Sequence, residues 1–399
     1  MKSKPPLLYL TSLAPFPGNT GGEVSIRERL NFLSEHFEIH CLIHNSQKFD
    51  LERKNQFISL WKSRLKTIQF FDPPWKDLSV FRRFLYFMKA LVSSKPWMHF
   101  TTSTAMVQEV KNLKKSLPES VPTMVEGWVG LSLPHLGWTV GKNDFYFAHN
   151  NEYLYHLAIA NSSKIGVLKL RNGIEAFKLK NYEGEAIQQY NGKVMVSSKK
   201  DQRSVKDMYD IQSILLPFIY PFKGGWDEGL AQKNRYVFIF TNASHEPNRD
   251  GILWFISKVW RNFPNNGFSL FISGKDNQNF LKSLEKLDGR IKYLGCLDPK
   301  DLEARICGAT LCLNPTRYGS GTPIKVLEAL SLGCPMVSTH ICCPEEFLDM
   351  IPTADAAEEF LKTLLDSLSQ AHLLSQKQSS FFHVYQKEAK EKLVELLMK

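Results

Sequence analysis

The amino-acid sequence predicts an α/β protein with two doubly wound halves, each built on a parallel sheet. Short runs of apolar, β-branched and aromatic residues alternate with longer stretches of helical composition, as in parallel strands joined by helical crossovers. The 399 residues, of which 43% are apolar and 23% charged, are enough for two domains with a core each. A segment rich in proline and glycine at 216–226 predicts the linker between them.

Each half has its own predicted strands. In the first half we expect strands at 7–13, 37–44, 123–126, 144–149 and 192–197, with helices between them. The second half begins with the apolar run 236–241, and a further strand-like run occupies 309–313. Residues from 355 onward have helical composition and predict the final helices.

The segment 309–339 carries the most functional information. Its pattern predicts a strand, a glycine loop, a short helix and a second strand, and Thr322 can cap a helix that starts at Pro323. Gly319 and Gly321 let the backbone approach a ligand where unpaired helix N–H groups and the positive end of the helix dipole collect. The segment therefore predicts an anion site that suits phosphate.

Two charged residues inside this predicted helix refine the prediction. Lys325 and Glu328 are three residues apart and share one helix face, while the apolar residues around them are free to pack inward. Lys325 lies in the first turn and suits a phosphate. Glu328 lies roughly 7.5 Å along the helix axis from Pro323, so it suits a ribose diol instead. The alternative is an exposed Lys–Glu surface pair.

This segment resembles the retaining glycosyltransferases of the GT-B fold, family 4 (glycosyltransferase group 1) type. The resemblance spans about residues 7–340 and keeps the order of the family's motifs. Besides residues 319–339, it is carried by Pro15-Phe-Pro17 with Gly21-Gly22, by His149-Asn-Asn-Glu152, by 246–255 and by 270–275.

The resemblance implies two Rossmann-like domains that face a cleft, with a C-terminal helix that crosses back to the first domain. Residues 1–218 are then the acceptor-binding domain, 219–375 the nucleotide-sugar-binding domain and 376–399 the terminal helix. The implied reaction moves a sugar from a nucleotide diphosphate sugar to an acceptor hydroxyl on a lipid, glycan or protein, with retention of configuration. No metal or other cofactor is expected, because cations and a helix N-terminus can stabilise the departing diphosphate.

The resemblance also implies roles for individual residues. His149 would contact the donor sugar, Lys325 the diphosphate and Glu328 the ribose. The residues expected to bind the donor are Gly21, Gly22, Arg249, Lys275, Arg317, Gly319, Ser320, Gly321, Thr322 and Pro323.

Two positions depart from the family pattern. Ser320 stands eight residues before Glu328, where many members have a carboxylate that contacts the transferred sugar. Residues 243–245 lack the basic residue that many members place there. The cations left to balance the diphosphate are Arg249, Lys275, Arg317 and Lys325, of which we place Lys325 first.

Several of these residues have a purely structural alternative. His149 follows an apolar run and so stands at a strand end, where open α/β sheets bind ligands, but it could also only cap the strand. We expect Glu152 to fix the loop by accepting backbone N–H bonds. Gly21 and Gly22 could form a loop with positive φ near the ligand or a plain turn. Glu126 ends its predicted strand as a carboxylate without an assigned task.

Three other functions compete with sugar transfer. A nucleotide-sugar epimerase shares the fold and would form product without an acceptor. A non-catalytic nucleotide-sugar-binding adaptor is the non-enzymatic alternative, since Ser320 has no carboxylate. An NAD-dependent enzyme fits less well, because Gly319-Ser-Gly321 lacks the third glycine of the dinucleotide fingerprint.

The cysteines and the hydropathy favour a cytoplasmic protein. The seven cysteines include no C-x-x-C pair, which favours free thiols over disulfides or zinc. No apolar run approaches the roughly 18 residues that cross a bilayer. Lys2 and Lys4 precede a short apolar run that meets Pro15, which predicts a first strand rather than a signal peptide.

A net charge of +10 raises the question of an anionic partner. The basic residues are scattered and match no nucleic-acid-binding motif, so we expect no nucleic-acid partner. Between residues 74 and 100, aromatic residues interleave with Lys76, Arg82, Arg83, Lys89 and Lys95. This mix predicts either an interfacial helix on an anionic membrane or a helix that packs its aromatic residues inward, and the sequence leaves both open.

Overall fold

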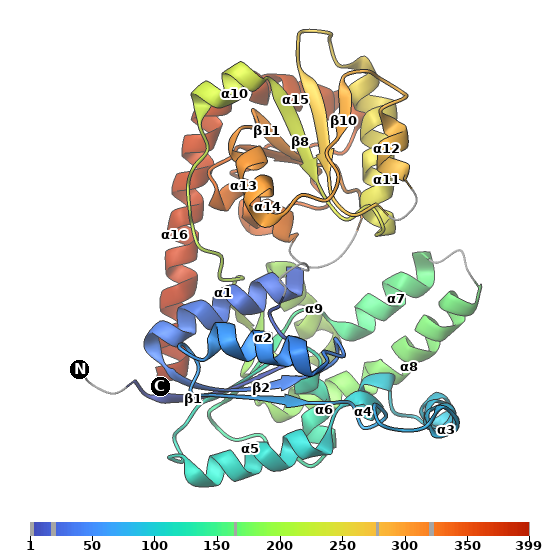
Figure 1. Ribbon diagram of the computed structural model, residues 1–399, viewed down its shortest axis with the longest axis vertical. Coiled ribbons are helices and arrows are strands. Elements are labelled where there is room, and N and C mark those ends of the chain that lie inside the picture. The colour runs from blue at the N-terminus through green and yellow to red at the C-terminus, as the bar shows by residue number, and fades with distance from the viewer. Residues whose placement is uncertain (1–3, 17–20, 163–165, 277–278, 319–322, 399) are drawn as a thin grey trace. The chain divides into compact units, whose positions relative to one another are not determined.

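The computed structural model describes residues 4–16, 21–162, 166–276, 279–318 and 323–398. The chain forms two compact units, one of Met1–Ile219 with Ala389–Lys399 and one of Tyr220–Glu388. Each unit holds one sheet with helices around it (Figure 1), and all strand pairs in both sheets are parallel. The predicted α/β class with two doubly wound halves is confirmed.

The first sheet has the order β3-β2-β1-β4-β5-β6-β7. Its strands are β1 (Pro6–Thr11), β2 (Glu38–His44), β3 (Thr67–Phe71), β4 (Thr123–Glu126), β5 (Asp144–Ala148), β6 (Val194–Val196) and β7 (Ile214–Leu215). Nearly every side chain of β1 and β5 is buried, because helices cover both faces of a parallel sheet. Figure 1 shows α1 and α2 on one face and α5 on the other.

The helices of the first unit connect these strands as crossovers. They are α1 (Gly21–His36), α2 (Leu51–Trp61), α3 (Val80–Val92), α4 (Trp97–Thr101), α5 (Thr104–Ser116), α6 (Val129–His135), α7 (Glu152–Ser162), α8 (Gly166–Gln189) and α9 (Lys199–Tyr209).

The five strands predicted for this half are all present, and β4 has the predicted bounds. The sequence does not predict β3 and β7, which are the two edge strands of the sheet. β3 is only half-buried and β7 is two residues long, so neither carries the strong apolar run that identifies a central strand.

The second unit repeats the architecture with the sheet order β10-β9-β8-β11-β12. Its strands are β8 (Tyr236–Phe240), β9 (Ser269–Ser273), β10 (Ile291–Tyr293), β11 (Leu311–Asn314) and β12 (Met336–Ser338). Its helices are α10 (Glu228–Asn234), α11 (Glu246–Trp254), α12 (Phe280–Leu284), α13 (Pro299–Cys307), α14 (Ile324–Ser331), α15 (Ala357–Ser369) and α16 (Ala371–Met398), with a π-helical turn at Phe255–Val259 and 3₁₀ turns at Trp260–Asn262 and Glu345–Phe347.

The last helix belongs to both units. Residues of α16 up to Glu388 are part of the second unit, and those from Ala389 onward are part of the first. In the first unit Leu393 and Leu397 are buried, and the ammonium of Lys390 lies 5.6 Å from the centre of the Phe32 ring. The expected return of the C-terminal helix to the first half is therefore confirmed.

Gly274 allows a very close approach of two backbone segments in the second unit. It has a φ of +136°, and a Cβ there would lie 1.7 Å from the carbonyl oxygen of Thr241. We expect Gly274→Ala to lower the free energy of unfolding by on the order of 3 kcal/mol, as measured by urea denaturation. Gly289→Ala is the matched control, since only open space surrounds its added Cβ, and it should change stability by less than about 1 kcal/mol. Equal losses for both variants would contradict the argument.

Candidate active site

Lys325 lies at the edge of the second sheet where β8 and β11 end. It stands in the first turn of α14, which begins at Ile324. Its Nζ donates to Asn248 Oδ1 at 2.9 Å, to Thr316 Oγ1 at 3.0 Å and to Thr241 Oγ1 at 3.3 Å. Thr241 follows β8 and Thr316 follows β11, so the parallel sheet brings these partners together at one edge.

The surroundings of Lys325 disfavour its charge. Burial lowers the pKa of Lys325 from its ordinary value to about 8, because removal from water disfavours the charged ammonium. Its three described hydrogen-bond partners are neutral oxygens and bring no negative charge to offset this effect. Burial also lowers the pKa of His245, and the positive charge of Lys325 lowers it further. An anion placed against Lys325 would stabilise its charged form. The alternative of an exposed Lys–Glu surface pair therefore does not describe this lysine.

A glycine holds α11 against the loop that follows β11. A Cβ on Gly251 would lie 2.5 Å from the carbonyl oxygen of Pro315, so only glycine permits this approach. The approach places Asn248, on the same helix, 3.2 Å from the hydroxyl of Thr316. Residues 246–255, one of the segments that carry the family resemblance, thus meet the segment that precedes Lys325.

The other predicted cations have different immediate partners. The guanidinium of Arg249 lies 4.5 Å from the centre of the Phe280 ring, and that of Arg317 lies 5.2 Å from the centre of the Trp254 ring. The carbonyl of Lys275 accepts from the backbone N–H of Ala243 at 2.9 Å. The described contacts of Lys325 are polar side chains at the strand ends.

The predicted glycine loop falls outside the described residues, since these exclude Gly319, Ser320, Gly321 and Thr322. The helix after the loop starts at Ile324, with Pro323 as its N-cap residue, one residue later than predicted. Glu328 lies on α14 and is partly buried. It shares a helix face with Lys325, as residues three apart do.

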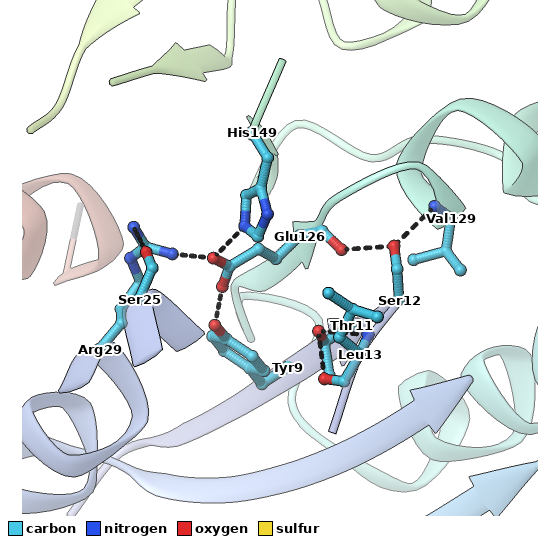
Figure 2. Close-up of polar contacts among 9 residues, drawn as sticks. All are labelled: Tyr9, Thr11, Ser12, Leu13, Ser25, Arg29, Glu126, Val129 and His149. Atoms are coloured by element: carbon cyan, nitrogen blue, oxygen red, sulfur yellow. Dashed lines mark hydrogen bonds and ion pairs between the residues drawn. The ribbon is translucent and has the colours of Figure 1, made fainter. Parts of the chain in front are cut away.

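His149 forms a second cluster, in the first unit, at the carboxyl ends of β4 and β5 (Figure 2). Its Nε2 lies 2.6 Å from Oε1 of Glu126, the last residue of β4. Arg29, from α1, donates through Nη1 to the same carboxylate oxygen, and Tyr9, from β1, donates its hydroxyl to Oε2. Glu126, for which the sequence predicts no role, therefore has three polar partners.

Gly21 and Gly22 do not form a loop with positive φ, which corrects the sequence prediction. They are the first two residues of helix α1, where N–H groups lack intrahelical partners and glycine costs little. A Cβ on Gly22 would lie 3.2 Å from Leu13 Cδ1 and 3.7 Å from Nδ1 of His149. The structure therefore brings Gly22 and His149 together by the packing of α1.

The structural role predicted for Glu152 belongs to Glu183 instead. The carboxylate of Glu183, on α8, accepts from the backbone N–H of Glu152 at 3.1 Å and of Tyr153 at 2.9 Å, at the start of α7. Burial raises the pKa of Glu183 to about 7. Burial, and then the negative charge of Glu183, raise the pKa of Glu152 to about 8.

Sequence reasoning missed Arg29 and Glu183. The sequence does contain a signal for Arg29, because its spacing places it on the same helix face as the apolar residues Ile26 and Leu33. The structure shows Arg29 fully buried on that face. No comparable signal marked Glu183, whose partners are about 30 residues away along the chain.

Other expected features can be checked over the described ranges. Within them no group of three or more His, Cys, Asp or Glu side chains is placed to hold a metal ion. All seven cysteines are free thiols. Among the described helices, none has the length and apolar character needed to cross a bilayer.

The sequence of this chain is similar to those of known proteins. Residues 235–370 match the family model for glycosyl transferases group 1. A Klebsiella pneumoniae protein described as an uncharacterized 44.6 kDa protein in cps region is 22% identical over 343 residues, which cover 84% of this chain and 83% of that protein.

Solved glycosyltransferase structures share the architecture. Sucrose-phosphate synthase from Thermosynechococcus elongatus superposes with a TM-score of 0.68 at 12% identity, over 98% of both chains. A TarM mutant from S. aureus, in complex with fondaparinux, alpha-GlcNAc-glycerol and UDP, gives 0.64 at 12% identity, over 99% of this chain and 100% of its own. HepE from Anabaena, in complex with UDP and glucose, gives 0.61 at 10% identity, over 98% of this chain and 99% of its own.

These similarities agree with the two parallel sheets. The fold is therefore that of the GT-B glycosyltransferases, residues 235–370 match glycosyl transferases group 1, and the chain is a glycosyltransferase.

Proposed function

We propose that this glycosyltransferase moves a sugar from a nucleotide diphosphate sugar to an acceptor hydroxyl, with retention of configuration and without a metal ion. The observation that carries the proposal is Lys325, a cation held by three neutral oxygens at the carboxyl ends of β8 and β11. A diphosphate would supply the negative charge that these partners lack. The UDP complexes of TarM and HepE support a nucleotide as part of the donor.

In the proposed reaction, the protein accelerates transfer mainly by stabilising the leaving group. The bond between the anomeric carbon and the phosphate oxygen breaks, and the acceptor oxygen bonds to the same face of the sugar. The acceptor proton passes to the departing diphosphate. Lys325 and the start of α14 stabilise the charge that develops on the diphosphate, a role that electrostatic preorganisation fills in many enzymes. Glu328 holds the ribose.

A panel of UDP, GDP, ADP, CMP and dTDP sugars tests the reaction. A thermal-shift screen first identifies the donor, because a ligand at ~100 times its dissociation constant adds about 2.7 kcal/mol of stability. Release of the nucleoside diphosphate is then measured with and without acceptors. An isomerised nucleotide sugar formed without acceptor would identify an epimerase, and tight binding without any turnover would identify an adaptor.

Glu328→Ala should weaken nucleotide binding while the fold survives. A hydrogen-bonded charge contributes about 1.5 to 3 kcal/mol, so the affinity for the nucleoside diphosphate should fall roughly tenfold or more. Isothermal titration calorimetry measures the change. Glu359→Ala, an exposed glutamate on α15, is the matched control and should leave the affinity unchanged. Equal affinities for the two variants would remove Glu328 from the ribose site.

Lys325→Ala should abolish most of the transfer and weaken the diphosphate far more than the nucleoside, because the missing charge acts only on phosphate. Lys362→Ala, which removes an exposed lysine on α15, is the control. Comparable losses for nucleoside and nucleoside diphosphate would argue against a phosphate role. EDTA should change the wild-type rate little, and strict dependence on a divalent ion would overturn the metal-free proposal.

The pH profile gives a second measurement on Lys325. Its pKa of about 8 means that the free enzyme loses this charge as the pH rises above about 8. The kcat/KM for the donor should therefore be flat below that pH and fall above it. Lys325→Arg keeps its charge at all these pH values, so its residual activity should lack this fall.

We also propose that the first unit contacts an anionic membrane through α3, which would favour a lipid-linked acceptor. Ala90 is the only fully buried residue of this helix. The exposed apolar side chains Phe81, Phe84, Leu85, Met88, Leu91 and Val92 follow the i, i+3, i+4 spacing of one helix face. Such an outward apolar face differs from the packing of ordinary surface helices, which turn it inward.

The other side of α3 is fixed to the first unit, next to α4 (Figure 1). The hydroxyl of Tyr86 donates to the carbonyl of Phe100 at 2.5 Å. Lys178, from α8, donates to the carbonyls of Ala90 and Leu91 at 2.9 and 3.0 Å. The apolar face therefore points outward on a helix that is held in place. Arg82 and Lys89, both exposed, flank this face, as suits an anionic leaflet.

Replacing Arg82 and Lys89 with Gln should release the protein from anionic vesicles. Each cation contributes about 1 kcal/mol near such a surface, so binding should weaken roughly thirtyfold. Arg83 is left unchanged in this variant because its Nε donates to the carbonyl of Leu78 at 2.8 Å, so replacing it would also remove a structural hydrogen bond. Cosedimentation with anionic and neutral vesicles measures binding.

The control for this experiment replaces Lys111 and Lys115, two exposed lysines of α5, with Gln. It removes the same charge and should leave vesicle binding nearly unchanged. A wild-type protein that shows no preference for anionic over neutral vesicles would contradict the membrane proposal and favour a soluble glycan or protein acceptor.

A further inference from the structure

We propose that Glu126 is a positioning residue that fixes the tautomer of His149, so that Nδ1 faces Gly22 as a hydrogen-bond acceptor for a substrate hydroxyl. The role of His149 toward substrate rests on the proposed transfer reaction. The effect of Glu126 on the ring rests only on contacts inside the first unit (Figure 2).

The register of three neighbouring strands puts these residues on one face of the sheet. Thr11 of β1 pairs with Glu126, and Glu126 pairs with Phe147 of β5. Side chains two residues apart on a strand share a face, which adds Tyr9 at one side and His149 at the other. Helix α1 crosses this face and delivers Arg29, whose guanidinium lies 3.8 Å from the centre of the Phe147 ring.

The carboxylate determines which ring nitrogen carries the proton. An ionised carboxylate only accepts hydrogen bonds, so Nε2 of His149, at 2.6 Å from Oε1, must donate. Nδ1 of the neutral ring then carries a lone pair. A histidine without this partner could take either tautomer.

Arg29 and Tyr9 keep the carboxylate ionised and in place. Burial raises the pKa of Glu126, and His149 opposes that effect. The positive charge of Arg29 on Oε1 and the hydroxyl of Tyr9 on Oε2 stabilise the anion further. Because Arg29 already supplies a counter-charge, Glu126 can orient His149 without requiring the ring to be charged. Arg29 and Glu126 are both fully buried, so the pair reaches substrate only through the ring.

The remaining edge of the ring faces α1. The rings of Phe147 and Phe218 flank His149 edge to face, at centroid distances of 5.8 and 6.2 Å. Nδ1 lies 3.7 Å from the point where a Cβ on Gly22 would stand. A side chain at position 22 would therefore stand in contact with Nδ1, whereas glycine places no side-chain atom there. The histidine keeps 13% of its side chain exposed.

A purely structural reading of the cluster explains less. A buried ion pair is weak evidence for stability, since apolar side chains of similar size often serve as well. Here the pair carries a third hydrogen bond, to a histidine at the carboxyl edge of the sheet where ligands bind. In other proteins, a carboxylate that is hydrogen-bonded to one ring nitrogen orients a functional histidine in the same way.

The first experiment reads the tautomer directly in the wild-type protein. Nitrogen-15 NMR of the histidine rings, with the His149 signals assigned by their loss in His149→Asn, distinguishes the two neutral forms. We expect the Nε2–H tautomer for His149. The Nδ1–H tautomer, or an even mixture, would overturn the proposal. This measurement needs no substrate, so it stands even if the transfer reaction proves wrong.

The second experiment uses kinetics on the donor identified in the panel. Glu126→Gln and His149→Asn should each lower kcat/KM roughly a hundredfold, and the double variant should lose little more, because Glu126 acts through His149. Fully additive losses would overturn the proposal. Glu119→Gln, an exposed carboxylate of the first unit, is the control for the loss of a charge.

Removing one member of a buried pair can unfold a protein, so folding needs its own variant. Arg29→Met combined with Glu126→Gln removes both charges together. Circular dichroism should show that this variant is folded, and its His149 signals should report a mixture of tautomers. Retention of the Nε2–H form in a folded double variant would show that Glu126 does not set it, and would overturn the proposal.

Discussion

The proposed sites depend on one constraint, which is that the strands within each sheet run parallel to one another. Parallel strands all end at the same edge, so residues that follow different strands meet there without being close in sequence. Thr241 and Thr316 come together in this way around Lys325. Glu126 and His149 come together in the same way at the ends of β4 and β5.

The two units treat buried charge in opposite ways. In the first unit Arg29 and Glu126 form a fully buried ion pair, which supports His149 without adding net charge. In the second unit the hydrogen-bond partners of Lys325 among the described residues are three neutral oxygens. A compensated pair suits a positioning role, whereas a cation whose described hydrogen-bond partners are neutral suits a ligand that arrives with its own negative charge.

Local pattern predicted the elements of the fold better than it predicted the contacts. The central strands and the polar residues that end them were visible in the sequence, because both follow from apolar runs and their boundaries. The edge strands β3 and β7 were missed because they bury too little to leave a signal. The partnership of Arg29 with Glu126 spans 97 residues of chain, and no local rule reports such a distance. Gly21 and Gly22 predict a loop or a turn but begin a helix, because glycine at a helix start resembles glycine in a turn.

The division of α16 between the units has a consequence for synthesis on the ribosome. Ala389, Leu393 and Leu397 are buried and belong to the first unit, yet they are translated after the whole of the second. Domains generally fold in the order in which they emerge, but here the N-terminal unit cannot complete its core until the second unit has been made. While the second unit is being translated, the first unit therefore exposes the apolar surface that α16 later covers. A chaperone would matter most during this period.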